Sequence, residues 1–178
     1  MKKYLVQFKP FLIFISTFLG VYVLLTFIYK YYLNQFQSNE IDVITNLVGD
    51  NVRYLMCLFD SDVKIQKNSL GSFLEVWYNN SYAVRIVEGC NAVSIMILFV
   101  SFVVSFSGKF KTTIFFLLFG ILIIHVLNVL RIALLTMLLF YFPEKSHFLH
   151  GVLFPLIIYG TVFVLWVIWV NKFSKYAK

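Results

Sequence analysis

The sequence is poor in charged residues, which make up 13% of its 178 residues, while 61% are hydrophobic. Soluble domains carry about 25% charged residues, so this shortage excludes an ordinary soluble protein. The 21 Phe and 11 Tyr add to the apolar character, and the composition indicates an integral membrane protein. No pattern typical of binding to RNA or DNA is present, so we expect no nucleic-acid partner.

Several catalytic motifs are also missing. The chain has no HExxH motif, no paired carboxylates inside an apolar run and no glycine-rich phosphate loop. It has only two cysteines, Cys57 and Cys90, and these have no second thiol at the close spacing of a zinc site. We therefore expect neither a metal nor a cofactor. A disulfide between the two cysteines is an alternative that the sequence leaves open.

Positive charge is unevenly distributed along the chain, whose net charge is +7. Seven of the eight acidic residues lie within residues 31–90. Lysines instead flank the apolar runs, at positions 2, 3, 9, 109, 111, 172, 175 and 178. These lysines form three clusters, at 2–9, 109–111 and 172–178. Because cytoplasmic loops are enriched in Lys and Arg, all three clusters are predicted to be cytoplasmic.

Four apolar runs approach the length of about 20 residues that a membrane span needs. They cover about residues 11–29, 91–107, 112–131 and 151–170. The fold predicted from them is an all-α polytopic membrane protein, a single membrane domain over 1–178 built as a bundle of about four transmembrane helices. A cleaved signal peptide is the competing interpretation of the first run, but no small-x-small cleavage site follows it. Both termini are predicted to be cytoplasmic, with 31–90 and 143–150 outside.

The third run is longer than one simple span. As a single helix, residues 112–142 would measure about 46 Å, whereas the hydrocarbon core is about 30 Å thick. About 20 residues from Thr112 lead to Arg131, so Arg131 is predicted to lie near the outer boundary. Residues 132–142 would then form an interfacial helix or a projecting extension, and a re-entrant arrangement is the alternative.

Residues 31–90 form the one segment able to build a small extracytoplasmic domain. Apolar residues recur at three- and four-residue steps over 41–59, which predicts an amphipathic helix lying on the membrane. Two β-rich stretches then surround Asn79-Asn80-Ser81, which predicts a hairpin. We therefore expect a small extracytoplasmic α/β-hairpin segment between the first and second spans.

Polar residues at span ends are the candidates for function. Arg131 keeps its charge in lipid, and it is either a snorkelling arginine or part of a site. Asn128 lies one turn before it on the same helical face, and His125 lies deeper. Cys90 opens the second run, where it is either a small apolar residue or a thiol whose anion is favoured by a helix N-terminus.

Two histidines, His147 and His150, lie just before the last run, and either could be a solvated loop residue. The topology inferred from lysines alone places Cys90, Arg131 and His150 at the outer ends of three spans. A thiolate nucleophile, a base and a fixed cation make a workable acyl-transfer site. In such a site His150 would take the thiol proton, and Arg131 would stabilise the oxyanion or bind a substrate carboxylate.

Three stretches of sequence also resemble motifs of a known family, the exosortase/archaeosortase membrane transpeptidases. They are EGCNAVSIMILFVSF, HVLNVLRIALL and SHFLHGVLFPLIIYG, and together they cover about residues 85–165. The resemblance is strongest to the short exosortase F subgroup. It implies a bacterial inner-membrane enzyme that cleaves the C-terminal sorting signals of exported proteins and transfers the new C-terminus to an acceptor.

The resemblance also implies roles for individual residues. Cys90 would be the nucleophile, Arg131 the family arginine and His150 the family histidine. The supporting residues would be Glu88, Asn91, Asn128 and His147. The implied partners are proteins with a C-terminal apolar helix and basic tail, the lipid bilayer, and a lipid or amine acceptor. The alternative function is a non-catalytic membrane scaffold or assembly subunit in the export of surface proteins or polysaccharides.

Overall fold

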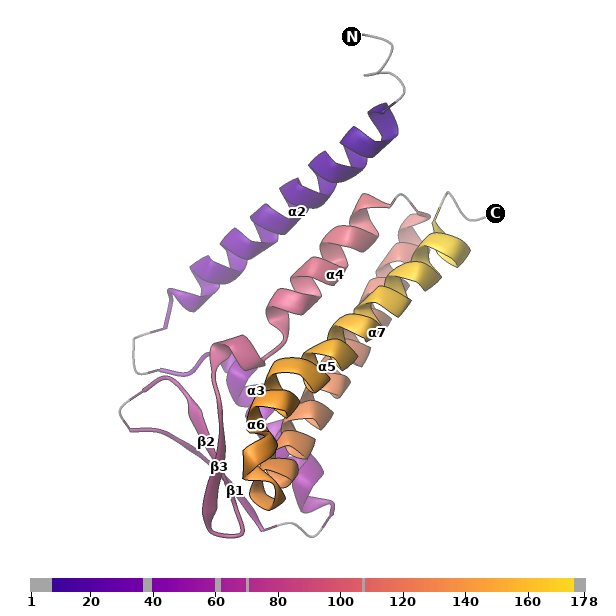
Figure 1. Ribbon diagram of the computed structural model, residues 1–178. Helices are drawn as coiled ribbons and strands as arrows, with labels where there is room; N and C mark the ends of the chain where they lie inside the picture. The colour runs from indigo at the N-terminus through magenta and orange to yellow at the C-terminus, as the bar shows by residue number, and fades with distance from the viewer. Residues whose placement is uncertain (1–7, 37–39, 60–61, 70, 107, 175–178) are drawn as a thin grey trace.

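The computed structural model describes residues 8–36, 40–59, 62–69, 71–106 and 108–174. Long helices run side by side, and at one end of them α3 and a three-stranded sheet form a small second layer (Figure 1). At the end that carries this small layer, the long helices bury apolar side chains against α3 and the sheet. Elsewhere they bury apolar side chains against each other.

Three helical runs are long and apolar enough to cross a membrane: α2 (Lys9–Leu33), α5 (Phe110–Tyr141) and the run Pro143–Phe173. The last run consists of η2 (Pro143–Lys145), α6 (Ser146–Phe148), the π-helical turn η3 (Leu149–Leu153), α7 (Phe154–Ile168) and η4 (Trp169–Phe173). These helices confirm the prediction of a mainly helical, polytopic membrane protein.

The second predicted span corresponds to a shorter helix, α4 (Val93–Ser105), with 13 residues. At 1.5 Å per residue it is about 20 Å long, which is less than the hydrocarbon thickness of about 30 Å. It packs against α2, α5 and α7 (Figure 1). A count of four spans therefore stays a prediction, because α4 reaches only part of the way through a bilayer by its own length.

The third run forms one continuous helix, without a break near Arg131. Helix α5 has 32 residues and is about 48 Å long. Residues 132–141 continue this helix, so they form neither a separate interfacial helix nor a re-entrant turn after Arg131. This extension packs beneath α3, β2 and β3, which bury Ile132 and Ala133, whereas Leu134 and Tyr141 stay exposed.

The small layer contains α3 (Val43–Cys57) and the strands β1 (Val63–Lys67), β2 (Leu74–Tyr78) and β3 (Ser81–Ile86). The strands pair antiparallel in the order β1-β2-β3. Asn79 and Asn80 connect β2 to β3 with positive φ angles, as a tight hairpin turn requires. The sequence patterns had indicated only two of these strands, because β1 carries two lysines and a glutamine and no aromatic residue.

Helix α3 begins at Asp42, whose side chain accepts hydrogen bonds from the backbone N–H groups of Ile44 and Thr45. Such caps satisfy donors that the first helical turn leaves free. The buried face of α3 includes Val48, Val52 and Met56. They pack in one cluster with the sheet and with Ile132 and Ala133 of α5. This cluster fixes the small layer onto the membrane helices.

The bundle core packs large aromatic rings closely. Phe99 of α4 and Trp169 of η4 are completely buried. The ring of Phe99 lies against Gly120 of α5, where an added Cβ would collide with it. Gly120 therefore permits the close approach of α4 to α5, as small residues do in other membrane helix pairs.

Candidate active site

Cys90 lies between the sheet and the bundle. Strand β3 leads directly into a short 3-10 turn, η1 (Glu88–Cys90), which is closed by the hydrogen bond from the Cys90 N–H to the Val87 carbonyl at 2.8 Å. Cys90 is partly buried and packs against the cluster of the small layer, while Cys57 is exposed, and both thiols are free. The chain thus places Cys90 where a strand ends and a membrane helix begins.

The placement corrects one expectation: Cys90 is not in the first turn of α4. Two residues separate η1 from α4, and the second, Ala92, has the left-handed φ of 62°. The side chain of Asn91 accepts the N–H of Val93 at 3.0 Å. The first amide of α4 therefore binds Asn91 and not the thiol of Cys90, so the argument from the helix N-terminus does not apply to Cys90.

Asn128 connects Cys90 to α5. Its side-chain amide nitrogen donates to the Cys90 carbonyl at 2.7 Å, and the residue is completely buried. Because residues three apart share a helical face, Asn128 and Arg131 lie one turn apart on the same side of α5. Cys90 is thereby held beside the face of α5 that carries Arg131.

Arg131 is partly buried, and no carboxylate among the described residues lies within ion-pair distance of it. Its Nε is buried without a hydrogen-bond partner, and so is the side-chain oxygen of Asn128. A donor and an acceptor are therefore both unsatisfied, one helical turn apart, next to Cys90. Buried polar groups in proteins are nearly always paired, so this pair is a candidate place for a bound polar group.

His150 lies on the π-helical turn η3, which precedes α7. It is exposed, and Arg131 is close enough to act on it electrostatically. The neighbouring Leu149 is buried with Leu135 of α5 and Phe154 of α7, so packing holds this turn against α5. Insertions of π-helical geometry occur frequently at functional sites.

The structure therefore relates the three predicted catalytic residues indirectly. Asn128 ties the backbone of Cys90 to α5, and Arg131 lies near enough to His150 for its charge to act on the imidazole. No hydrogen bond between the thiol of Cys90 and His150 is present within the described part of the chain. Catalytic hydrogen bonds often form only in the substrate complex, so the absence of this bond is compatible with the predicted roles. Nothing in the geometry assigns those roles by itself.

The supporting residues differ in their environment. Glu88 and His147 are both exposed, on η1 and α6. Asn91, in contrast, is almost completely buried, and its side-chain amide nitrogen donates to the hydroxyls of Tyr29 at 2.8 Å and Thr45 at 3.2 Å. Asn91 thus ties α2 and α3 to the segment that carries Cys90.

Sequence reasoning missed the partners of Asn91. Thr45 is completely buried, and its hydroxyl donates to Asp42, which is itself buried. The only sequence signal for this network is Asp42 in front of an apolar periodic stretch, which is a typical helix N-cap pattern. Nothing distinguishes Tyr29 from the other tyrosines of α2, because its role comes from a residue 62 positions away.

His125, the deeper histidine of α5, belongs to a different contact. Its Nε2 lies 2.9 Å from the side-chain amide of Asn51 on α3. It therefore helps attach α3 to α5. The site around Cys90 does not include it.

These features define a class of protein: a multi-pass helical membrane protein with a free thiol, a cation without an acidic partner and a histidine near one end of its bundle. The model of the transmembrane exosortase family matches residues 8–171, which is most of the chain. The chain belongs to this family. Membership indicates a membrane transpeptidase of the cysteine type and confirms the resemblance at the level of the family, whereas the exosortase F subgroup stays a prediction. No curated protein and no solved structure matches the chain.

Proposed function

We propose that the protein is a cysteine transpeptidase of the exosortase F type, which cleaves C-terminal sorting signals of exported proteins at the outer face of the bacterial inner membrane. One observation supports a peptide as substrate. The unsatisfied oxygen of Asn128 and the unsatisfied Nε of Arg131 lie one turn apart beside Cys90. A peptide group supplies both an N–H donor and a carbonyl acceptor, so it pairs with both atoms at once.

The reaction begins when the Cys90 thiol loses its proton to His150 and its sulfur attacks the scissile carbonyl carbon. The carbonyl oxygen becomes an oxyanion, which the guanidinium of Arg131 stabilises. The C–N bond then breaks, and His150 gives the proton to the leaving amine. The substrate is left as a thioester on Cys90. An acceptor amine or water attacks this thioester, its proton passes to His150, and the thiolate leaves.

The proposed topology has both termini in the cytoplasm. The α4–α5 connection and the C-terminal end of the described chain lie together, since Gly108 forms a bridge with Ser174. The N-terminal end of α2 lies at the same end of the bundle (Figure 1). The three lysine clusters flank these segments in sequence. One end of the molecule therefore collects the positive charge, which supports a cytoplasmic position for it. Cys90 lies toward the opposite end.

The proposed substrate is an exported protein that ends in an apolar helix and a basic tail. Such a helix packs within the bilayer, and its basic tail stays on the cytoplasmic side by the same charge rule. The segment in front of the helix is thereby brought to the level of Cys90. Cleavage there releases the protein from its membrane anchor, and transfer attaches it to an amine or lipid acceptor.

The two cysteines allow a matched test of the proposed chemistry. We expect Cys90→Ala to abolish processing of C-terminal sorting signals in cells, whereas Cys57→Ala leaves it intact. The measurement is mass spectrometry of the C-terminal peptides of exported proteins, together with a blot that shows equal insertion of both variants. Normal processing by Cys90→Ala would exclude the enzyme and favour the scaffold alternative.

A further inference from the structure

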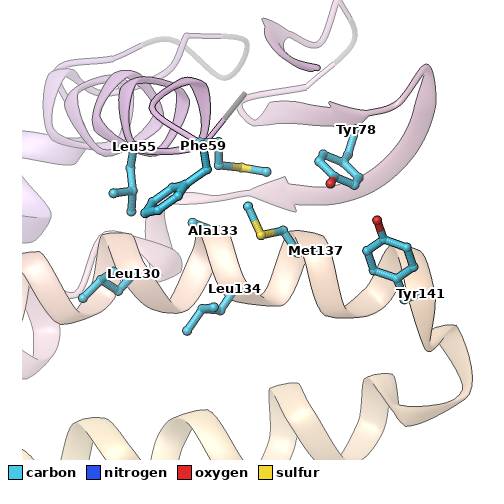
Figure 2. A pocket seen from close by; sticks show the side chains of 9 residues that line it. Leu55, Phe59, Tyr78, Leu130, Ala133, Leu134, Met137 and Tyr141 are labelled. Atoms are coloured by element: carbon cyan, nitrogen blue, oxygen red, sulfur yellow. The ribbon is translucent and has the colours of Figure 1, made fainter. Parts of the chain in front are cut away.

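A groove of about 470 Å³ lies between α3 and the C-terminal part of α5. Its walls are formed by side chains of both helices, and Tyr78 of β2 closes one end (Figure 2). None of Cys90, Arg131 and His150 lines it. Its volume is within the range of small-molecule pockets, about 300–1,000 Å³.

The lining of the groove is apolar along its length. Leu55 of α3 and Phe59, which follows this helix, lie across it from Leu130 and Leu134 of α5 (Figure 2). Leu134 keeps 48% of its surface exposed and Phe59 keeps 70%. Two adjacent apolar walls that stay this exposed would be unfavourable in water, because burial of apolar surface stabilises proteins.

The groove is continuous with a long exposed face of α5. Apolar residues of this face follow each other at three- and four-residue steps, and all are exposed: Phe115, Leu118, Leu122, Val126, Leu130 and Leu134. In a helix that crosses a membrane, such a face contacts the acyl chains of lipids. The groove thus begins where the lipid-facing side of α5 passes beneath α3.

The length of α5 places the groove in the bilayer. The helix is about 48 Å long, and a bilayer measures about 40–45 Å when its headgroup regions are included. With an average tilt of about 20°, the 32 residues of α5 therefore reach from one headgroup region to the other. Leu130 and Leu134 then lie toward the outer boundary of the hydrocarbon, at the level of Arg131, and Tyr141 at the C-terminal end of α5 lies in the headgroup region.

The polar end of the groove fits this placement. Tyr78 and Tyr141 turn their hydroxyl groups toward each other there (Figure 2), close enough to interact. Tyrosines favour the level where headgroups meet hydrocarbon. The outer face of α3 also carries exposed apolar side chains at Val43, Leu47 and Leu58, as expected for a helix that lies on a membrane surface.

From this arrangement we propose that the groove binds one acyl chain of a bilayer lipid. The ester end of the chain lies at Tyr78 and Tyr141, and its methylenes run along Leu134 toward Leu130 and into the leaflet. The bound chain would complete the packing of α3 against α5. This proposal does not depend on catalysis by Cys90, and the two can fail separately.

The test uses photocrosslinking of the full-length chain, with Cys90→Ala to remove any transfer reaction. The protein is reconstituted in vesicles of phosphatidylglycerol that carries a diazirine in one acyl chain, and labelled residues are mapped by mass spectrometry. We expect labelling of Leu55 and Phe59 as well as of Leu134. Leu118, on the exposed face of α5, is the positive control, and Val52, completely buried on α3, is the negative control.

Two variants make the test specific. Ala133→Phe places a ring in the groove, and we expect it to lower labelling of Leu55 at least about tenfold, because the ring occupies the volume of the chain. Leu122→Phe adds a ring to the open face of α5 and should leave the labelling of Leu55 unchanged. If Ala133→Phe does not insert, Leu134→Trp serves the same purpose.

The position of the diazirine tests the orientation of the lipid. A group near the ester should label Tyr141 and Met137, whereas a group at the chain end should label Leu130. Labelling of Leu118 without labelling of Leu55 and Phe59 would overturn the proposal. Equal labelling of Leu55 in the Ala133→Phe variant and in the protein without this substitution would overturn it as well.

Discussion

The side chain of Asn91 allows the most detailed prediction, because it holds the segment next to Cys90 in place. It makes three hydrogen bonds: it donates to Tyr29 at 2.8 Å and to Thr45 at 3.2 Å, and it accepts from Val93 at 3.0 Å. It is 2% exposed. In Asn91→Ala all three bonds are lost, and the Val93 N–H loses its side-chain acceptor.

Each such bond contributes about 0.5–1.5 kcal/mol, so Asn91→Ala should lower the free energy of unfolding by about 1.5–4.5 kcal/mol. For a protein of this size each kcal/mol lowers Tm by about 2–4 °C, which predicts a fall of several degrees. Because Cys90 is the adjacent residue, we also expect processing of sorting signals to fall by about 10- to 100-fold. The measurements are thermal unfolding in detergent and a processing assay.

A matched control is Asn46→Ala on α3. Asn46 is exposed and makes one side-chain hydrogen bond, to the carbonyl of Ile41 at 3.2 Å. Its loss should change stability by about 0.5 kcal/mol or less and leave processing unchanged. In a double-mutant cycle, Tyr29→Phe and Asn91→Ala should be non-additive, since they remove the same bond. Equal effects of Asn91→Ala and Asn46→Ala, or additivity in this cycle, would refute the reasoning.

Three further predictions concern charged and titrating groups. Arg131→Lys should lower processing at least about tenfold, because the planar fork of arginine is lost, while Arg53→Lys, in an exposed pair with Asp50, should have little effect. His150→Ala should lower the rate by about 10²–10⁴-fold, as expected for a general base, and His147→Ala should not; equal losses would leave the base unassigned. Hydrogen bonds from three side chains lower the pKa of Glu75 below its ordinary value. The stabilisation by this carboxylate should therefore be complete above about pH 4.3, the ordinary pKa of Glu, and should be lost as the pH falls through the lower pKa of the folded state. Thermal unfolding of Glu75→Gln should therefore be less acid-sensitive than that of the parent chain, and identical pH profiles would exclude this contribution.

The apolar runs predicted much of the helical architecture, because lipid requires every backbone polar group to be satisfied within a helix. Residues 112–142 showed the limit of this approach. Hydropathy alone does not tell whether an apolar segment faces lipid or protein, and α3 and the sheet cover one side of the end of α5. A break after Arg131 was therefore one reasonable interpretation of a helix that is in fact continuous.

The start of α4 could not be located from the sequence for a local reason. Ala92 adopts the left-handed conformation, which non-glycine residues seldom take, so nothing in EGCNAVSI signals that the chain turns there. The consequence is functional, since it separates Cys90 from the helix N-terminus. Sequence reasoning could identify the candidates Cys90, Arg131 and His150, because they are polar residues at the ends of apolar runs. It could not identify the contacts of Asn91 and Asn128, since these contacts join segments 38–62 residues apart.

The central claim is that Cys90 forms a covalent link with the substrate, and one measurement tests it directly. The Cys57→Ala protein, in which Cys90 is the remaining thiol, is mixed with a membrane peptide that carries a C-terminal apolar helix and basic tail, and then quenched in acid. We expect intact-mass analysis to find an adduct of the N-terminal part of the peptide, mapped to Cys90 and released by hydroxylamine as a thioester is. Cleavage of the peptide without any adduct on Cys90, or with an adduct on another residue, would contradict the account.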